Sequence, residues 1–224
     1  SVGLYETYPY RGTFDGNGHT VTFNMVSQST EAIAPFHMVS DATIKNLHMV
    51  GSIESSKKFA SGLIGQIVEN ATVNIENCHS SITIKSHVNG DATSGGFIGL
   101  SNGNATISNC LFDGSFEGAD CHSNGGFVGW TYKLISIKNC LFAPDHISTK
   151  LDQCKTWGRT NASSLYRINN CYATQTYSND NDATLVGSMP ASELAAKLGS
   201  ENWQVADNKV IPVFEYSIPN FYHK

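Results

Sequence analysis

The sequence carries little charge and has no long apolar run. Charged residues make up only 15% of the 224 residues, and the formal net charge is −5. Nucleic-acid-binding domains need a basic stripe, so this composition argues against a nucleic-acid partner. No apolar run approaches the roughly 18–20 residues of a membrane-spanning helix, so we expect no membrane span. The apolar share of 40% is nevertheless too high for a disordered chain.

Helix-forming residues are also sparse, except between residues 190 and 199. Asn, Ser, Thr, Gly and β-branched residues take their place, which is typical of an all-β chain with many turns. No signal peptide begins at Ser1. We therefore expect a mature chain or a segment cut from a longer protein.

The cysteines are spaced as members of a repeat. Four of the six follow an asparagine, and the intervals from Cys78 to Cys110, Cys140 and Cys171 are 32, 30 and 31 residues. The surrounding segments superimpose: ATIKNLHM, TVNIENCHS, ATISNCLF, ISIKNCLF and YRINNCYA. Glycine-rich blocks recur between them, namely SGLIG, GGFIG, GGFVG and the degenerate TWGR. The dominant signal is therefore an internal repeat of about 31 residues.

This repeat predicts an all-β, single-stranded parallel β-helix of about six coils. A leucine-rich repeat would be shorter, helical repeats would need amphipathic helices, and a propeller blade would be longer. Residues 1–187 are expected to form the β-helix, and residues 188–224 a capping segment of the same domain. Successive coils pair their backbones about 4.8 Å apart, so equivalent residues stack into ladders.

Three ladders follow from this alignment. The isoleucines at 44, 75, 107, 137 and 168 are expected to stack in the core. An asparagine ladder lies at a bend, where Asn tolerates the left-handed conformation. A cysteine ladder follows it directly, and stacked parallel side chains predict free thiols rather than disulfides or a tetrahedral metal site. The ladder residues are Asn46, Asn77, Asn109, Asn139 and Asn170, with Cys78, Cys110, Cys140 and Cys171.

Two cysteines stand outside the ladder. Cys121 and Cys154 occupy similar places in successive coils, just before the GGFVG block and its degenerate copy. A disulfide between them is possible if the loop geometry lets their Cβ atoms converge, which the sequence alone does not decide.

The blocks SGLIG, GGFIG and GGFVG, each followed by a strand with I-x-N-C, resemble the GLUG repeats of bacterial cell-surface proteins. The stretch GTFDGNGHTV is similar to the opening coil that precedes such repeats. The resemblance covers roughly residues 9–187 and implies a right-handed parallel β-helix on an exported protein of a gut-type bacterium. It carries no catalytic residue, because the repeat motif is structural.

The opening stretch itself is interpreted as a turn. Asp15, Gly16, Asn17 and Gly18 suit a tight turn with positive φ that leads into a strand over 19–23. Calcium ligation by Asp15 and Asn17 is the alternative, although an EF-hand loop would need more acids and a terminal glutamate. A phosphate-binding loop would need a lysine and a following helix.

The C-terminal residues predict a cap made of a helix and a hairpin. PASELAAKL has Pro190 near its start, Ser192 as a candidate N-cap and Gly199 as the stop. The following NWQVADNKVIPVFEY predicts a hairpin that turns at Asp207 and Asn208. We expect its apolar residues to cover the last coil, because an open β-helix end exposes strand edges.

The sequence contains no recognisable catalytic set. A β-helix lyase would need clustered acids beside a basic residue, and the arginines at 11, 159 and 167 have no such neighbours at coil spacing. A glycoside hydrolase would need paired carboxylates. Asp113 or Glu117 with Asp145 are candidates on neighbouring coils, but surface acids on stacked coils approach one another by chance. We expect no catalytic residue, no metal and no cofactor.

Two columns are candidates for ligand contact. Strand alternation places one column outward, and apolar residues on an exposed sheet mark contact surfaces; it comprises His48, His79, Leu111, Leu141 and Tyr172. A loop of the same chain is the competing occupant of this column. The second column is expected to be a core ladder, and only if it faced outward would it stack on sugars; it comprises Phe36, Leu63, Phe97, Phe127 and Trp157.

The function predicted from these features is that of a non-catalytic, extracellular or cell-surface module. It would be adhesin-like, with carbohydrate or a host glycoprotein as partner, alongside other domains of a longer parent protein. A carbohydrate-active β-helix enzyme is the first alternative, and a structural spacer in a larger surface protein or peptidase is the second.

Overall fold

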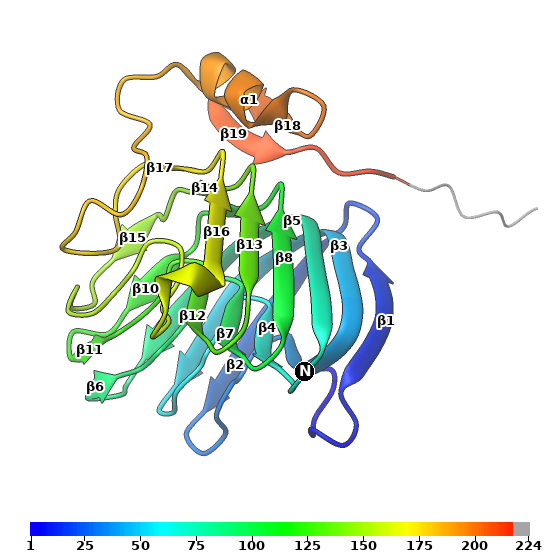
Figure 1. Ribbon diagram of the computed structural model, residues 1–224, viewed down its shortest axis with the longest axis vertical. Coiled ribbons are helices and arrows are strands. Elements are labelled where there is room, and N and C mark those ends of the chain that lie inside the picture. The colour runs from blue at the N-terminus through cyan, green and yellow to red at the C-terminus, as the bar shows by residue number, and fades with distance from the viewer. Residues whose placement is uncertain (217–224) are drawn as a thin grey trace, which may run out of the picture.

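The protein is a parallel β-solenoid with a helix and a hairpin on one side of it. A computed structural model describes residues 1–216 (Figure 1). The column that begins at Phe14 continues through Ile44, Ile75, Ile107, Ile137 and Ile168, each paired in parallel with the next. These six stacked rungs correspond to about five full turns, in agreement with the predicted parallel β-helix. Among the described residues, no helix has the length and apolarity that a membrane crossing requires.

Each turn contributes strands to three faces. The first face contains the start of β3 (Phe36–Ser55), followed by β4 (Ile64–Ile67), β7 (Ile98–Ser101) and β12 (Val128–Thr131). The second face contains β1 (Tyr10–Asp15), the middle of β3, the start of β5 (Thr72–Ser86), β8 (Asn104–Ser108), β13 (Ile135–Lys138) and β16 (Tyr166–Asn169).

The third face carries shorter strands beside the ends of β3 and β5. These are β2 (Thr20–Ser27), β9 (Leu111–Phe112), β10 (Ser115–Glu117), β14 (Leu141–Phe142), β15 (His146–Ile147) and β17 (Tyr172–Ala173). The pair β6 (Gly90–Asp91) and β11 (Cys121–His122) lies in the loops beyond this face, and a short 3₁₀ helix, η1 (Ser163–Leu165), precedes β16.

The interior is filled by stacked aliphatic and aromatic side chains. Ile44, Ile75, Ile107 and Ile137 are fully buried, whereas Ile168 on the last rung is 40% exposed. The column of Phe36, Leu63, Phe97, Phe127 and Trp157 is also buried. It is therefore a core ladder, and its last member, Trp157, borders a surface pocket.

The asparagine ladder makes the sharp bend between the second and third faces. All five residues have positive φ, between 50° and 53°. Their amides bond along the stack at its two ends: Asn46 Nδ2 donates to Asp15 Oδ1 at 3.1 Å, and Asn170 Nδ2 donates to Asn139 Oδ1 at 2.9 Å. In the middle, Asn77 Oδ1 and Asn109 Oδ1 have no hydrogen-bond partner in the described part of the chain.

The thiols behind this bend are free and buried. The sulfurs of Cys110, Cys140 and Cys171 each donate at 3.2 Å to the carbonyl two residues earlier. Burial raises the pKa of the Cys110 thiol well above its usual value. The disulfide considered for Cys121 and Cys154 is not formed, and Asn124 contacts both sulfurs. Its backbone N–H is 3.2 Å from Cys154 Sγ and its side-chain amide 3.9 Å from Cys121 Sγ.

Hydrogen bonds within the protein account for the opening turn at residues 15–18. Asn17 and Gly18 have φ of 49° and 75°, and Asn17 N–H donates to Asp15 Oδ1 at 2.9 Å. The same Asp15 oxygen accepts from Asn46 on the next rung. This acid therefore ties the first turn to the asparagine ladder.

The cap differs from its prediction in two respects. Helix α1 (Ala191–Gly199) follows Pro190, which is the N-cap and makes no side-chain capping bond, so Ser192 lies inside the helix. The hairpin of β18 (Trp203–Ala206) and β19 (Lys209–Pro212) turns at Asp207 and Asn208 as predicted, with φ of 49° and 60°. Residues 217–224 of the predicted capping segment lie outside the described residues.

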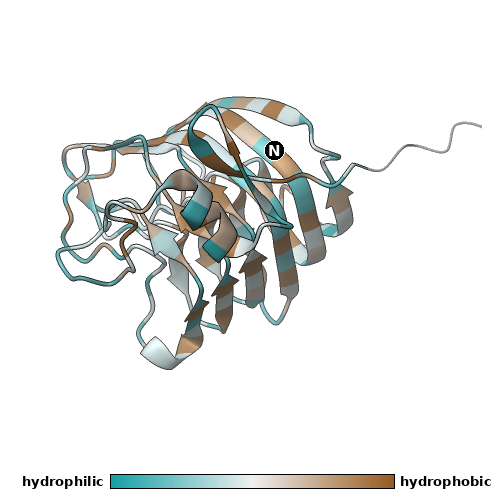
Figure 2. Cartoon of the chain, turned by 90° about the horizontal axis from the view of Figure 1, so that it is seen from above, coloured by the Kyte–Doolittle hydropathy of each residue, from teal (hydrophilic) through white to brown (hydrophobic). Residues whose placement is uncertain are grey.

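The second difference is the position of the cap. It crosses the stack above the asparagine bend instead of closing the last coil (Figures 1 and 2). Asn170 Nδ2 donates to Lys197 O at 2.7 Å, Trp203 Nε1 donates to Asn139 O at 3.2 Å, and Glu215 N–H donates to Asn46 Oδ1 at 3.1 Å. The last strand, β16, pairs only with β13 among the described strands and stays largely exposed.

Candidate functional site

The predicted contact column has an apolar half, which the C-terminal cap covers, and a polar half formed by His48 and His79. Its five residues pair in sequence along the third face, from His48 to Tyr172. Leu111 and Leu141 are only 2% and 3% exposed, because they pack with Leu194, Leu198 and Trp203 of the cap. The chain's own C-terminal segment therefore occupies the apolar half, and the structure offers no open apolar strip there.

The polar half forms a connected network. The rings of His48 and His79 stack with centroids 4.0 Å apart and an interplanar angle of 10°. Ser81 Oγ lies 2.9 Å from His48 Nε2, 3.0 Å from His79 Nε2 and 2.5 Å from Asp113 Oδ1. Asp113 Oδ1 is also 2.7 Å from His79 Nε2. Thr20 Oγ1, at 3.3 Å, contacts the other nitrogen of His48.

This network of two histidines, a serine and an aspartate was not predicted from the sequence. It differs from the serine hydrolase arrangement, in which serine and aspartate contact opposite nitrogens of one imidazole. Here Ser81 and Asp113 both approach Nε2 of His79. The geometry fixes the side chains of Asp113 and Ser81 between two coils.

The network is expected to make the stability of the protein depend on pH. Burial, reinforced by the neighbouring His79, lowers the pKa of His48 from its usual 6.5 to about 4. Burial alone would raise the pKa of Asp113, but hydrogen bonds from His79 and Ser81 bring it below its usual value. The unfolded chain therefore binds more protons than the folded chain, first at His48 and then, below about pH 4, at Asp113.

Stability is consequently expected to fall as the pH drops from 7 towards 4. The lowering of the His48 pKa corresponds to about 3 kcal/mol in the free energy of unfolding. Because His48 is partly exposed, we expect a loss of about 1–2 kcal/mol. Urea unfolding of wild type and His48→Gln at several pH values would measure it, with His146→Gln as an exposed control. An equal acid sensitivity in wild type and His48→Gln would contradict the assignment.

A groove remains open between the third face and the cap, and we call it the flank groove. Its volume is about 560 Å³. Asp113, Asp145 and Thr174 line it from the solenoid, and Asn208 and Lys209 line it from the hairpin. Its apolar lining is provided by Leu111, Leu141, Ala143, Pro144, Val186, Met189, Ala191, Leu194 and Val210. Of the predicted acid pairs, Asp113 and Asp145 share this groove, whereas Glu117 lines a different depression.

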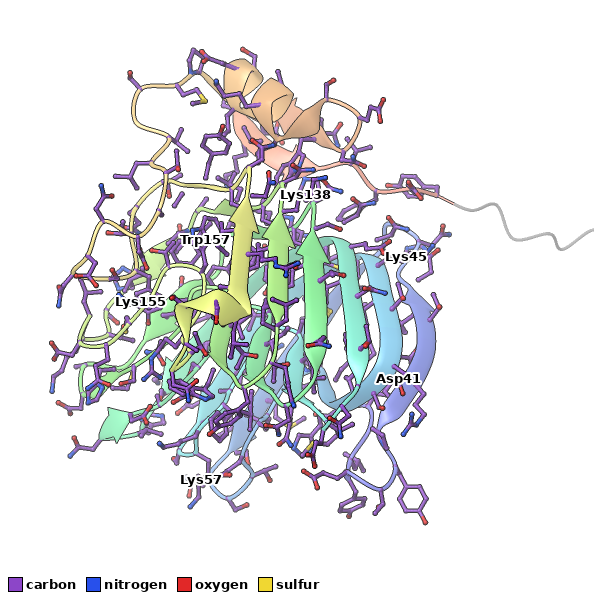
Figure 3. The ribbon with its side chains drawn as sticks, viewed as in Figure 1. Asp41, Lys45, Lys57, Lys138, Lys155 and Trp157 are labelled. Carbon is purple, nitrogen blue, oxygen red and sulfur yellow. The ribbon has the colours of Figure 1, made fainter. Side chains whose placement is uncertain are left out.

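A second hollow lies at the end of the solenoid beside the exposed last rung, and we call it the end pocket. It measures about 760 Å³. Trp130, Trp157 and Tyr166 supply its aromatic lining, and Gln153 and Asn161 stand among its polar residues. Lys155 and Trp157 can be located in Figure 3 near η1 and β16. No segment of residues 1–216 forms a cap over this end.

The aromatic rings of the end pocket are each in contact with neighbouring groups. Trp157 packs edge-on against Phe127 with centroids 5.1 Å apart, and the Arg159 guanidinium lies 5.1 Å from the Trp130 ring centroid. Tyr166 lies against Gly158, where a Cβ atom would come within 2.2 Å of the Tyr166 hydroxyl. Burial raises the pKa of Tyr166 well above its usual value, so its hydroxyl remains protonated.

One polar atom of this pocket is unpaired. Trp130 Nε1 is buried and has no hydrogen-bond partner among the described residues. By contrast, Lys155 pairs with Asp180, and Asp182 accepts from both the backbone N–H and the hydroxyl of Thr156, at 2.8 and 2.6 Å. Asp180 and Asp182 are therefore engaged in contacts within the protein, whereas the side chains of Gln153 and Asn161 are exposed at the edge of the pocket.

Sequence reasoning did not identify the end pocket. Trp130 directly follows the GGFVG block, and Trp157 replaces the phenylalanine in the degenerate copy TWGR. The signal was the departure of this copy from the repeat, since a tryptophan at the phenylalanine position of TWGR must lie on the coil next to that of Trp130.

Comparison with known proteins supports the fold. No family of known proteins and no curated protein matches the chain. Among solved structures, the chain is similar to one described as a "putative immunoglobulin A1 protease from Bacteroides ovatus". The TM-score is 0.58 at 19% identity, over 96% of this chain and 80% of that chain. At this identity the similarity establishes a shared β-solenoid architecture.

Proposed function

We propose that the chain is a non-catalytic module of an exported bacterial protein and that its end pocket binds carbohydrate, including glycans on host glycoproteins. The observation that carries the proposal is the pocket's composition. Three aromatic rings line the pocket beside the side-chain amides of Gln153 and Asn161, which make no hydrogen bond within the described part of the chain. Rigid apolar walls with a few placed polar groups characterise ligand pockets, and aromatic faces next to hydrogen-bonding side chains suit sugar rings.

Two further observations support an exported setting. The glycine-rich blocks resemble those of bacterial surface proteins, and all the repeat-forming residues are accounted for by turns, core and ladders. The similar solved structure is described as a "putative immunoglobulin A1 protease", and immunoglobulins are extracellular proteins. On this proposal the module acts beside other domains of a longer surface protein.

The test begins with a glycan array and a panel of immobilised glycoproteins probed with the wild-type chain. For any ligand found, the affinity is then compared among Tyr166→Ala, the double variant Gln153→Ala/Asn161→Ala, and Tyr8→Ala. Tyr8 is 77% exposed and does not line the end pocket, so it is a matched aromatic control. The first two variants are expected to bind about tenfold more weakly, because each loses a hydrogen-bonding or stacking group.

Circular dichroism would show that each variant is folded. Tyr166 lies on the edge strand β16, so its replacement by alanine could perturb that strand. The double variant Gln153→Ala/Asn161→Ala leaves β16 unchanged and provides a second test. Binding that survives both end-pocket variants would remove the end pocket from the proposal. Complete absence of glycan and glycoprotein binding would overturn the proposed function and favour a structural spacer.

A further inference from the structure

The two walls of the flank groove carry opposite charges. The solenoid wall presents Asp113 and Asp145, and the hairpin wall presents Lys209 with the amide of Asn208. The apolar surface between them is partly accessible, because Ala143, Val186 and Met189 are only half-buried. A ligand complementary to this groove would carry a cationic group, an anionic group and apolar surface between them.

The two carboxylates are held by the solenoid backbone. Asp113 N–H donates to Ser80 O at 3.1 Å, and Asp145 N–H donates to Gly114 O at 2.9 Å, which fixes the residues on successive coils. Oδ1 of Asp113 contacts His79 and Ser81, and these contacts keep the carboxyl ionised at neutral pH. The solenoid wall is thus a rigid anionic surface.

The cationic wall is set by the hairpin turn. Asp207 and Asn208 adopt positive φ, and Lys209 begins β19 directly after them. Within the described part of the chain, neither Lys209 nor Asp145 takes part in an ion pair. Because the cap is fixed to Asn139 and Asn170, Lys209 is held at the groove opposite the carboxylates.

We propose that the flank groove binds a zwitterionic ligand of the amino-acid class, meaning an apolar amino acid or a short apolar peptide with free ends. Its ammonium group is placed at Asp113 and Asp145, and its carboxylate at Lys209 and Asn208. Its apolar side chains lie on Val186, Met189 and Ala143. The volume of about 560 Å³ is within the range of small-molecule sites. This site is separate from the end pocket and does not depend on the proposed function.

The probes for the test are leucyl-leucine and free leucine, measured by isothermal titration calorimetry on the full chain. N-acetyl-leucyl-leucine lacks the ammonium group, and leucyl-leucine amide lacks the carboxylate. The variants are Asp145→Asn and Lys209→Met. Asp120→Asn and Lys133→Met are matched controls, because neither residue lines the flank groove.

The proposal predicts a specific pattern across probes and variants. Wild type binds leucyl-leucine at least about tenfold more tightly than either blocked peptide. Asp145→Asn lowers the affinity for leucyl-leucine about tenfold and leaves the affinity for the acetylated peptide unchanged. Lys209→Met lowers the affinity for leucyl-leucine by a similar factor and leaves the affinity for the peptide amide unchanged. Tighter binding of the dipeptide than of leucine identifies a peptide site, and the reverse identifies an amino-acid site.

Two results would overturn the proposal. One is no heat of binding for any probe up to about 10 mM in the wild-type chain. The other is equal weakening of all probes by each variant, which would indicate a disturbed cap. Hydrogen exchange of α1 identifies that disturbance independently, since an intact cap keeps Leu194 and Leu198 protected.

Discussion

Replacing Gly95 by alanine is expected to cost more than about 4 kcal/mol or to prevent folding altogether. A Cβ atom at this position would lie 1.9 Å from Ile98 O and 2.6 Å from Gly129 N. Both are backbone atoms: the first lies within the same glycine-rich block and the second in the next coil. Neither can move aside without breaking the parallel ladder of β7 and β12.

Gly12→Ala is the matched control for this change. It also places alanine at a glycine, but a Cβ there meets nothing within 4 Å and only the positive φ of 94° is strained. We expect this control to lose about 1–2 kcal/mol. Guanidinium unfolding followed by circular dichroism would compare the two. A loss at Gly95 no greater than at Gly12 would refute the steric explanation of the glycine-rich blocks.

The Trp203→Ala variant is expected to lose about 3–5 kcal/mol of cap-docking stability while the solenoid stays folded. Trp203 is 2% exposed, packs with Leu111 and Leu141, and donates its indole N–H to Asn139 O. Its removal leaves a cavity in the apolar contact between cap and solenoid. Because the rungs make their own backbone pairs, the loss should be confined to the cap.

Hydrogen exchange measured by mass spectrometry would separate the two parts. In Trp203→Ala, amides of 191–212 should exchange much faster, whereas those of β5, β8 and β13 should keep their protection. Val205→Ala is a suitable control, because Val205 lies on the same strand and is 43% exposed. Uniform loss of protection across the rungs would show that cap and solenoid form one cooperative unit.

The sequence was sufficient to predict the solenoid, but it was not sufficient to predict which face of the solenoid the C-terminal segment covers. The interval of about 31 residues places Ile44 on Ile75, and the left-handed asparagines mark the bend, because a repeat predicts its own neighbours. Strand alternation placed Leu111 and Leu141 on the outside correctly. It could not show that α1 would cover them, because that contact joins a repeat to a segment outside it.

The alignment of the repeats contains a signal that could have predicted the His79 network. His79 pairs with Leu111, so Ser81, two residues later, must lie beside Asp113 on the next coil. The alignment that gave the ladders therefore also predicts this contact. The end pocket has a different origin, because it arises where the repeat fails and Gly158 makes room for Tyr166.

The path of the C-terminal segment has a mechanical consequence. A solenoid whose rungs contact only their neighbours comes apart from either end, one rung at a time. Here one segment is anchored at Asn170, Asn139 and Asn46, which lie on the sixth, fifth and second rungs. Peeling the last rung away therefore first requires breaking contacts of this segment. Docked in this way, the C-terminal segment should raise the force needed to separate the rungs, because its contacts must break before the rungs can part.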